Sequence, residues 1–241
     1  MDGFGPATYG DRIADLYDEW HEGIGDTDQT VEFLAALADG GPVLELGVGT
    51  GRVALPLAAR GIEVVGIEGS EAMAAKLKEK EGGEAVRVFV GDFADTAVEG
   101  TFRVIFAAFN TFLLPTQEAQ ARCFENGARH LDPGGAVVVD ALVPHQGAQG
   151  DGVKVLGMGL DHVLLLASRY DPTSQQQEMQ YILIREEGVR LVPMLTRLSS
   201  PSELDFMARV AGLRVRERWG GWRREPFVRS SMRHVSVYER V

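Results

Sequence analysis

The sequence VLELGVGTGR, from Val43 to Arg52, is the densest signal in this chain. A short apolar run leads into three glycines, Gly47, Gly49 and Gly51, and a helix is predicted to begin directly after them. Glycines in such a turn let the backbone bend tightly and let a ligand approach the main chain without meeting a Cβ. The N-terminus of the helix then offers unpaired N–H groups to oxygen atoms of the ligand. The stretch therefore predicts a cofactor-binding loop between a strand and a helix.

The glycine spacing separates two classes of cofactor. Nicotinamide and flavin enzymes space their glycines G-x-G-x-x-G, which here would need glycine at the position that Arg52 occupies. Glu45 stands two residues before the first glycine, where its carboxylate would repel a pyrophosphate. The same carboxylate suits S-adenosylmethionine, which carries an ammonium and a sulfonium but no phosphate. We therefore expect S-adenosyl-L-methionine as the cofactor, with a nicotinamide-dependent oxidoreductase as a rival interpretation.

Strand and helix signals alternate after this loop. The strand-like runs are continuously apolar, as parallel strands covered by helices on both faces require. Repeated strand–helix units of this length imply right-handed crossovers and one parallel sheet. The pattern predicts an α/β fold with a doubly wound, Rossmann-like sheet. The runs after the first strand are Ile62–Ile67, Val86–Val90, Val104–Phe109 and Ala136–Leu142.

The chain is predicted to have three parts. Residues 1–40 form a helical lid, and residues 41–146 together with 200–241 form the α/β domain. Residues 147–199, after the fifth strand, contain four strand-like segments separated by turn residues and predict an antiparallel β insertion. This insertion is interpreted either as a cover over the acceptor or as the surface of a homodimer.

Polar side chains follow the predicted strands at their carboxyl ends, where open α/β sheets bind ligands. Glu68 ends the second strand, and its carboxylate can accept hydrogen bonds from both hydroxyls of a ribose. Asp92 follows the third strand and can accept a bond from an adenine amino group, while Phe93 can cover the ring. Asn110 follows the fourth strand. Together with Glu45, these residues match the polar parts of S-adenosylmethionine in order.

The sequence resembles the class I S-adenosylmethionine-dependent methyltransferases, roughly from Tyr9 to Leu142 and again in the C-terminal strands. The resemblance depends on VLELGVGTGR, on VVGIEGSEAM ending at Met73, on VGDFAD around Asp92, and on LDPGGAVVVD. It implies a seven-stranded, mostly parallel sheet whose last strand, near His234–Glu239, runs antiparallel. It also implies that the chain is an enzyme that transfers a methyl group.

The resemblance implies roles for individual residues. Glu45, Gly47 and Gly49 would hold the methionine portion of the cofactor. Glu68 would bind the ribose, and Met73 would pack against the adenine ring beside Asp92 and Phe93. The residues expected to bind the cofactor are Tyr17, Glu45, Gly47, Gly49, Gly51, Glu68, Met73, Asp92, Phe93 and Asn110.

The segment YGDRIADLYDEWH, Tyr9–His21, resembles the lid helix of the small-molecule branch of this family, which includes amino-sugar N-methyltransferases. By that resemblance Tyr17 would lie close to the sulfonium, with Trp20 nearby. Without it, the aromatic residues of the segment are simply the packing face of a helix.

Methyl transfer is a direct displacement at an activated carbon, so the main task of the enzyme is to align acceptor and methyl group. A base is needed only if the acceptor must lose a proton, and His145 and His162 are the candidates. No metal is expected, because the acids stand one at each strand end instead of in a cluster. We expect transfer to nitrogen or oxygen of a small-molecule acceptor. A cofactor-binding regulatory protein without catalysis is the alternative.

Composition excludes several kinds of partner. A formal net charge of −11 disfavours nucleic acid and acidic membrane surfaces. Asn110 is followed by Thr111, so the Asn/Asp-Pro-Pro-aromatic motif of nucleic-acid amino-methylating relatives is absent. No apolar run is long enough for a membrane span, and no secretory signal is recognised at the N-terminus. The single cysteine, Cys123, suits a cytoplasmic protein.

Overall fold

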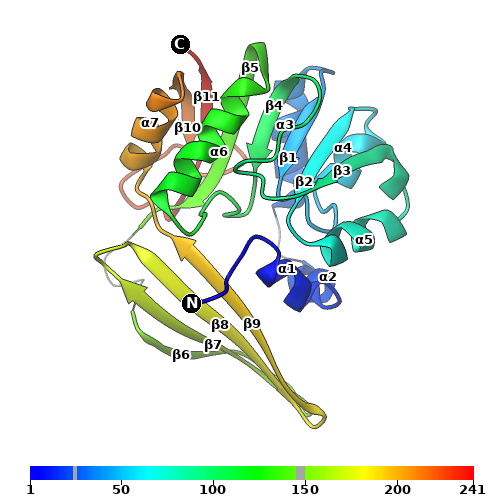
Figure 1. Cartoon of the computed structure of the whole chain (residues 1–241), viewed down its shortest axis with the longest axis vertical. Helices are drawn as coiled ribbons and strands as arrows, with labels where there is room; N and C mark the ends of the chain where they lie inside the picture. Colours follow the sequence, from blue (N-terminus) through cyan, green and yellow to red (C-terminus); the bar gives the residue numbers. More distant parts are fainter. Residues whose placement is uncertain (24–25, 145–149) are drawn as a thin grey trace.

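The computed structural model describes residues 1–23, 26–144 and 150–241 (Figure 1). Seven strands form one sheet, in the spatial order β10 (Leu213–Trp219), β11 (Arg233–Arg240), β5 (Leu131–Leu142), β4 (Phe102–Ala107), β1 (Val43–Leu46), β2 (Val64–Glu68) and β3 (Val86–Val90). Strands β1 to β5 pair in parallel with their neighbours, whereas β11 runs antiparallel to both β5 and β10. The predicted mostly parallel sheet with an antiparallel last strand is confirmed.

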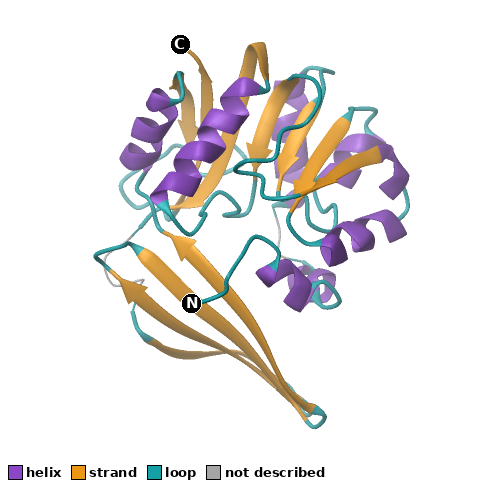
Figure 2. Ribbon diagram, in the orientation of Figure 1, coloured by secondary structure: helices purple, strands orange, loops and turns teal. Residues whose placement is uncertain are grey.

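Helices cover both faces of this sheet (Figure 2). Side chains of α6 and α7 pack into one apolar cluster, and those of α3, α4 and α5 pack into the cluster on the other face. The free thiol of Cys123 is buried in the first cluster, and burial raises its pKa, as expected for a structural thiol. The helices are α3 (Thr27–Ala38), α4 (Ala54–Ala59), α5 (Glu71–Glu79), the 3-10 turn η1 (Gly83–Ala85), α6 (Gln117–Arg129) and α7 (Pro201–Val210).

Four more strands form a separate antiparallel sheet, which we call the insertion sheet: β6 (Gly152–Met158), β7 (His162–Asp171), β8 (Gln176–Arg185) and β9 (Gly188–Arg197). The sheet is attached to the α/β part at one end. There Arg197 N–H donates to the carbonyl of Leu114 at 3.2 Å, and Gln176 Nε2 donates to the carbonyl of Pro115 at 2.8 Å. The antiparallel insertion after the fifth strand is therefore confirmed.

The N-terminal segment differs from the single helix predicted for Tyr9–His21. It forms two short helices, α1 (Thr8–Ile13) and α2 (Tyr17–His21), separated by a tight turn. In this turn Leu16 N–H donates to the carbonyl of Ile13 at 2.8 Å. The break lets Ile13 and Leu16 pack together against the inner face of the insertion sheet. The long-range apolar contact therefore overrides the local preference for one continuous helix.

The two lid helices lie between the insertion sheet and the carboxyl ends of β1 and β2 (Figure 1). Asp15 pairs with Arg190 of β9 at 2.6 Å on one side, and Asp18 pairs with Lys80 at 2.7 Å on the other. Among the residues that the structure describes, no helix has the length and apolar character needed to cross a bilayer.

Candidate active site

The glycine loop between β1 and α4 has a backbone that only glycine adopts readily. Gly47, Gly49 and Gly51 have φ angles of 75°, 55° and 85°. A Cβ on Gly47 would lie 2.5 Å from Cγ2 of Thr111, and a Cβ on Gly49 would lie 3.4 Å from Cε of Met73. The loop is thus closely lined by side chains, and its main chain stays open to a ligand at these three positions because the glycines carry no Cβ atoms.

Glu45 lies beneath this loop and is 5% exposed. One of its carboxylate oxygens, Oε2, is buried without a hydrogen-bond partner among the described residues. Burial raises the pKa of Glu45 well above its usual value, and the charge of Glu68 raises it further, while a backbone N–H of Ala54 lowers it. An acid with an unpartnered oxygen in a dry site suits a cationic ligand group, so the site fits the ammonium of S-adenosylmethionine.

Glu68, at the end of β2, is 8% exposed and joins the glycine loop to the start of α5. Its Oε2 accepts a hydrogen bond from Gly49 N–H at 2.8 Å, and its Oε1 accepts one from Ser70 N–H at 2.9 Å. Burial raises the pKa of Glu68, and these backbone donors oppose the shift. Glu68 therefore has a structural role in addition to the ribose binding predicted for it.

The predicted adenine-binding residues lie around the same loop. Met73 is buried and contacts Gly49, and the ring of Phe93 lies 3.6 Å from the position of a Cβ on Gly47. Asp92 is half-buried and accepts a hydrogen bond from Ala94 N–H at 2.9 Å, which fixes the turn after β3. The structure thus brings Met73 and Phe93 to the glycine loop from two different strand ends.

Tyr17 of the lid also faces this group. Its pKa is raised mainly by burial; the guanidinium of Arg52 lowers it, and the carboxylates of Glu45 and Glu68 raise it further. The ring stacks on His21 with a centroid distance of 4.2 Å. Trp20, in contrast, packs against Tyr181 of the insertion sheet, 5.9 Å between ring centroids.

The tip after β4 carries two strained residues. Phe109 and Asn110 have φ angles of 55° and 67°, which is uncommon for residues with a side chain. The guanidinium of Arg52 lies 3.9 Å from the centroid of the Phe109 ring. Sequence reasoning used Arg52 only to reject a dinucleotide and did not place it in the site. Its position directly after the last glycine was the signal that could have identified it.

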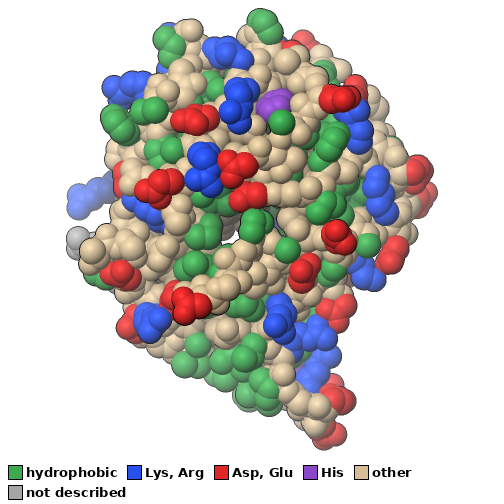
Figure 3. All heavy atoms as spheres, in the orientation of Figure 1, with side chains coloured by type: hydrophobic (Ala, Val, Ile, Leu, Met, Phe, Trp, Pro, Cys, Tyr) green, Lys and Arg blue, Asp and Glu red, His purple; other side chains and the backbone are tan. Residues whose placement is uncertain are grey.

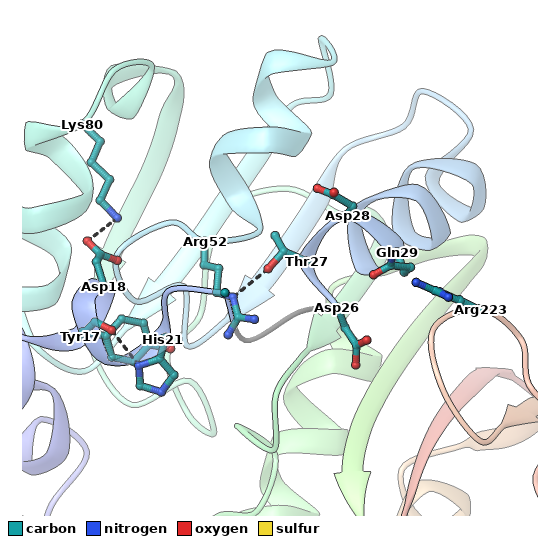
Figure 4. Close-up of a pocket in the computed structure, with 11 residues that line it drawn as sticks. Tyr17, Asp18, His21, Asp26, Thr27, Asp28, Gln29, Arg52, Lys80 and Arg223 are labelled. Atoms are coloured by element: carbon teal, nitrogen blue, oxygen red, sulfur yellow. Dashed lines mark hydrogen bonds and ion pairs between the residues drawn. The ribbon is translucent and has the colours of Figure 1, made fainter. Parts of the chain in front are cut away.

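A cavity of about 560 Å³ opens beside Tyr17 (Figure 4). Its size is within the range of small-molecule sites. Acidic and basic side chains face it from the lid, from the start of α3 and from the glycine loop. The cavity is lined by Tyr17, Asp18, His21, Gly23, Asp26, Thr27, Asp28, Gln29, Arg52, Lys80 and Arg223.

The two base candidates stand apart from this group. His145 lies outside the described residues. His162 begins β7 and pairs with Arg185 at the end of the insertion sheet farthest from the α/β part, where its Nδ1 is 2.8 Å from an oxygen of Asp161. Across the described ranges 1–23, 26–144 and 150–241, no cluster of His, Cys, Asp and Glu suited to a metal ion is found.

A seven-stranded sheet of this topology, with a glycine loop and buried acids at neighbouring strand ends, defines the α/β methyltransferase class. The family model described as a methyltransferase domain matches residues 43–135. The cypemycin N-terminal methyltransferase of a Streptomyces species is 32% identical over 206 residues, which cover 84% of this chain and 84% of that protein. The chain belongs to the S-adenosylmethionine-dependent methyltransferases.

Solved structures agree with this assignment. The CcbJ methyltransferase from Streptomyces caelestis is 43% identical, with a TM-score of 0.92, over 99% of this chain and 100% of that one. The S-adenosylmethionine-bound amino pentose methyltransferase CalS10 from Micromonospora echinaspora, at 20% identity and a TM-score of 0.69, covers 92% of this chain and 96% of its own. That second likeness shows the fold. The chain is an enzyme that uses S-adenosylmethionine as methyl donor, so the oxidoreductase and regulatory alternatives are not favoured.

Proposed function

We propose that this enzyme methylates an amine nitrogen, either on a small molecule or at the amino terminus of a peptide. The observation that carries this choice is the match over 84% of both chains to an enzyme whose name gives an N-terminal acceptor. We place the enzyme in the cytoplasm, in keeping with the buried free thiol of Cys123.

The cofactor residues are proposed to act as follows. Bound S-adenosylmethionine supplies a methyl group activated by a sulfonium. Glu45 binds the ammonium through its unpartnered oxygen, and Glu68 accepts hydrogen bonds from the ribose hydroxyls. The lid residue Tyr17, held above the glycine loop, excludes water from the reacting atoms. Orientation of this kind can lower the barrier by about 7–11 kcal/mol.

The rest of the predicted cofactor set is proposed to bind at the edges of the same site. The main chain at Gly47, Gly49 and Gly51 approaches the methionine portion, and Asn110 faces it from the β4 tip. The adenine lies between Met73 and Phe93, with Asp92 accepting a bond from its amino group. His162 and His145 remain the candidates for a base, and the lid and the insertion sheet are proposed to enclose the acceptor.

The nitrogen assignment predicts which probes accept a methyl group. We expect a product 14 Da heavier from peptides with a free amino terminus or from amino sugars, and none from the same peptides after acetylation or from the corresponding hydroxy sugars. The reason is that an acylated amine has no lone pair available for displacement. Mass spectrometry after incubation with S-adenosylmethionine measures this. Methylation of the hydroxy probes alone would overturn the assignment to nitrogen.

We also propose that two copies associate through the outer face of the insertion sheet. The pairing register places Val155, Leu165, Ile182 and Leu191 in one row across that face. Val155 is 63% exposed and Leu191 is 49% exposed, and Figure 3 shows hydrophobic side chains gathered over this part of the molecule. A large exposed apolar face is typical of an interaction surface, and a flat one suits the self-complementary contact of a two-fold dimer.

The dimer proposal predicts the effect of charge on this face. The native chain is expected to elute with twice its mass of 26.2 kDa, and the double variant Val155→Asp, Leu191→Asp is expected to elute as a monomer. Burying two carboxylates in each half of an apolar contact would cost more than the contact contributes. Size-exclusion chromatography with light scattering measures the mass. Val210→Asp on the exposed side of α7 is the control, and a native monomer would contradict the proposal.

A further inference from the structure

Asp140, near the end of β5, is the centre of a buried polar cluster. Its side chain is 1% exposed and accepts hydrogen bonds from three different parts of the chain. Phe109 N–H donates to Oδ2 at 2.9 Å, Trp222 Nε1 donates to Oδ2 at 3.2 Å, and Arg233 donates through Nε at 3.2 Å and Nη2 at 2.6 Å. A carboxylate this deeply buried is stable only with such partners, so the cluster is specifically built.

Arg233 connects Asp140 to a second carboxylate, that of Asp26. It binds Asp140 with two nitrogens and pairs with Asp26 just before α3. Asp26 in turn lines the cavity described above. One guanidinium thus connects the β5 strand end to the wall of the cavity, with each of its partners held by a charged hydrogen bond.

Asp140 holds the strained tip after β4. It binds Phe109 through its side chain, and its own carbonyl accepts a hydrogen bond from Asn110 N–H at 3.2 Å. Phe109 and Asn110 are the residues of this tip that have left-handed backbone, and such a conformation costs about 1–3 kcal/mol each. The bonds to Asp140 are therefore what keeps the tip in this shape.

The tip contacts the glycine loop in two places. Thr111 lies directly against Gly47, at 2.5 Å from the position of a Cβ on that glycine. The Phe109 ring lies under the guanidinium of Arg52, 3.9 Å away. Any change in the shape of the tip would consequently move the walls of the cofactor site.

We propose that Asp140 is a positioning residue for methyl transfer, which fixes the β4 tip against the glycine loop and is itself oriented by Arg233. The inference rests on the proposed placement of the cofactor at that loop. Asp140 acts through Phe109 and Asn110 and does not touch the reacting atoms. Its function is to keep methyl donor and acceptor aligned, because a misplacement of about 1 Å can cost about 100-fold in rate.

Asp140→Asn tests this proposal, because asparagine has nearly the same size but replaces one acceptor oxygen with an NH2 group. In the full chain with S-adenosylhomocysteine bound, we expect amides 108–113 to exchange hydrogen about tenfold faster than in the native protein. We expect kcat with the best amine probe to fall about 100-fold, while KM and the Kd for S-adenosylhomocysteine change by less than about fivefold. The exchange and binding measurements need no acceptor, so they stand even if the amine proposal fails.

Asp205→Asn is the matched control. Asp205 pairs with Arg218 and accepts a hydrogen bond from Tyr238 Oη at 3.0 Å, on α7 and away from the glycine loop. This variant should lose stability without a change in kcat or in exchange at residues 108–113. If Asp140→Asn does not fold, Arg233→Lys is the second variant, because lysine keeps the positive charge but cannot bind Asp140 with two nitrogens. It should likewise lower kcat and speed exchange at residues 108–113 while leaving KM and the Kd for S-adenosylhomocysteine nearly unchanged. Unchanged exchange and kcat in a folded variant, or equal losses in the control, would overturn the proposal.

Discussion

Glu68→Ala is expected to weaken S-adenosylmethionine binding by about 100-fold or more. Two hydrogen bonds from ribose hydroxyls to a carboxylate contribute about 1.5–3 kcal/mol each, and the variant has neither. The loss of the bond to Gly49 N–H also releases the glycine loop, so the binding site itself becomes less ordered. Isothermal titration with S-adenosylmethionine and S-adenosylhomocysteine measures the effect on both ligands.

Two variants separate binding from folding in this experiment. Glu68→Gln keeps a side-chain oxygen for Gly49 and is expected to bind the cofactor with intermediate affinity. Glu71→Ala removes an exposed carboxylate from the first turn of α5, the helix that follows Glu68, and should bind normally. The melting temperature of Glu68→Ala should also fall, because two backbone N–H groups lose their acceptor. Native affinity in folded Glu68→Ala would remove this residue from the site.

The parts of the fold that depend on local signals could be predicted from the sequence. The glycine loop follows from the need for positive φ at Gly47, Gly49 and Gly51, and the start of α5 follows from Ser70, whose hydroxyl accepts a hydrogen bond from Met73 N–H. Parallel strands present their carboxyl ends at one edge, so acids that follow successive strands had to lie near one another. Glu45 and Glu68 could therefore be placed together without a structure.

The parts that depend on contacts between distant segments could not be predicted in this way. Arg233 binds Asp140 and Asp26, which lie 93 and 207 residues away in the sequence. No periodicity or motif records such a pairing. The turn between α1 and α2 has the same origin, because it forms where Ile13 and Leu16 meet the insertion sheet. Tertiary packing decided both features, against or independently of local preference.

Glu45→Gln is expected to weaken binding of the cofactor by more than about 100-fold, because removing one partner of a buried ion pair costs about 3–5 kcal/mol. The pH dependence of binding should change with it. In the free protein burial raises the pKa of Glu45, so binding of the cofactor ammonium requires release of a proton. The affinity of the native protein should therefore rise with pH until Glu45 is ionised, whereas that of the variant should not depend on this group.

The same substitution should have the opposite effect on the stability of the free protein. The folded-state pKa of Glu45 lies above its unfolded value, so the folded protein binds this proton more tightly. Its contribution to stability is present below about pH 4.5 and is lost as the pH rises through the folded pKa. The melting temperature of the free native protein should accordingly fall relative to that of Glu45→Gln as the pH rises above about 4.5, the usual pKa of a glutamate. Saturating S-adenosylhomocysteine should remove the difference, because its ammonium pairs with the ionised carboxylate. If the melting temperatures of the ligand-free native protein and Glu45→Gln changed equally with pH, the Glu45 carboxylate would not be a buried acid without a partner. The reason to place the cofactor ammonium beside it would then be removed.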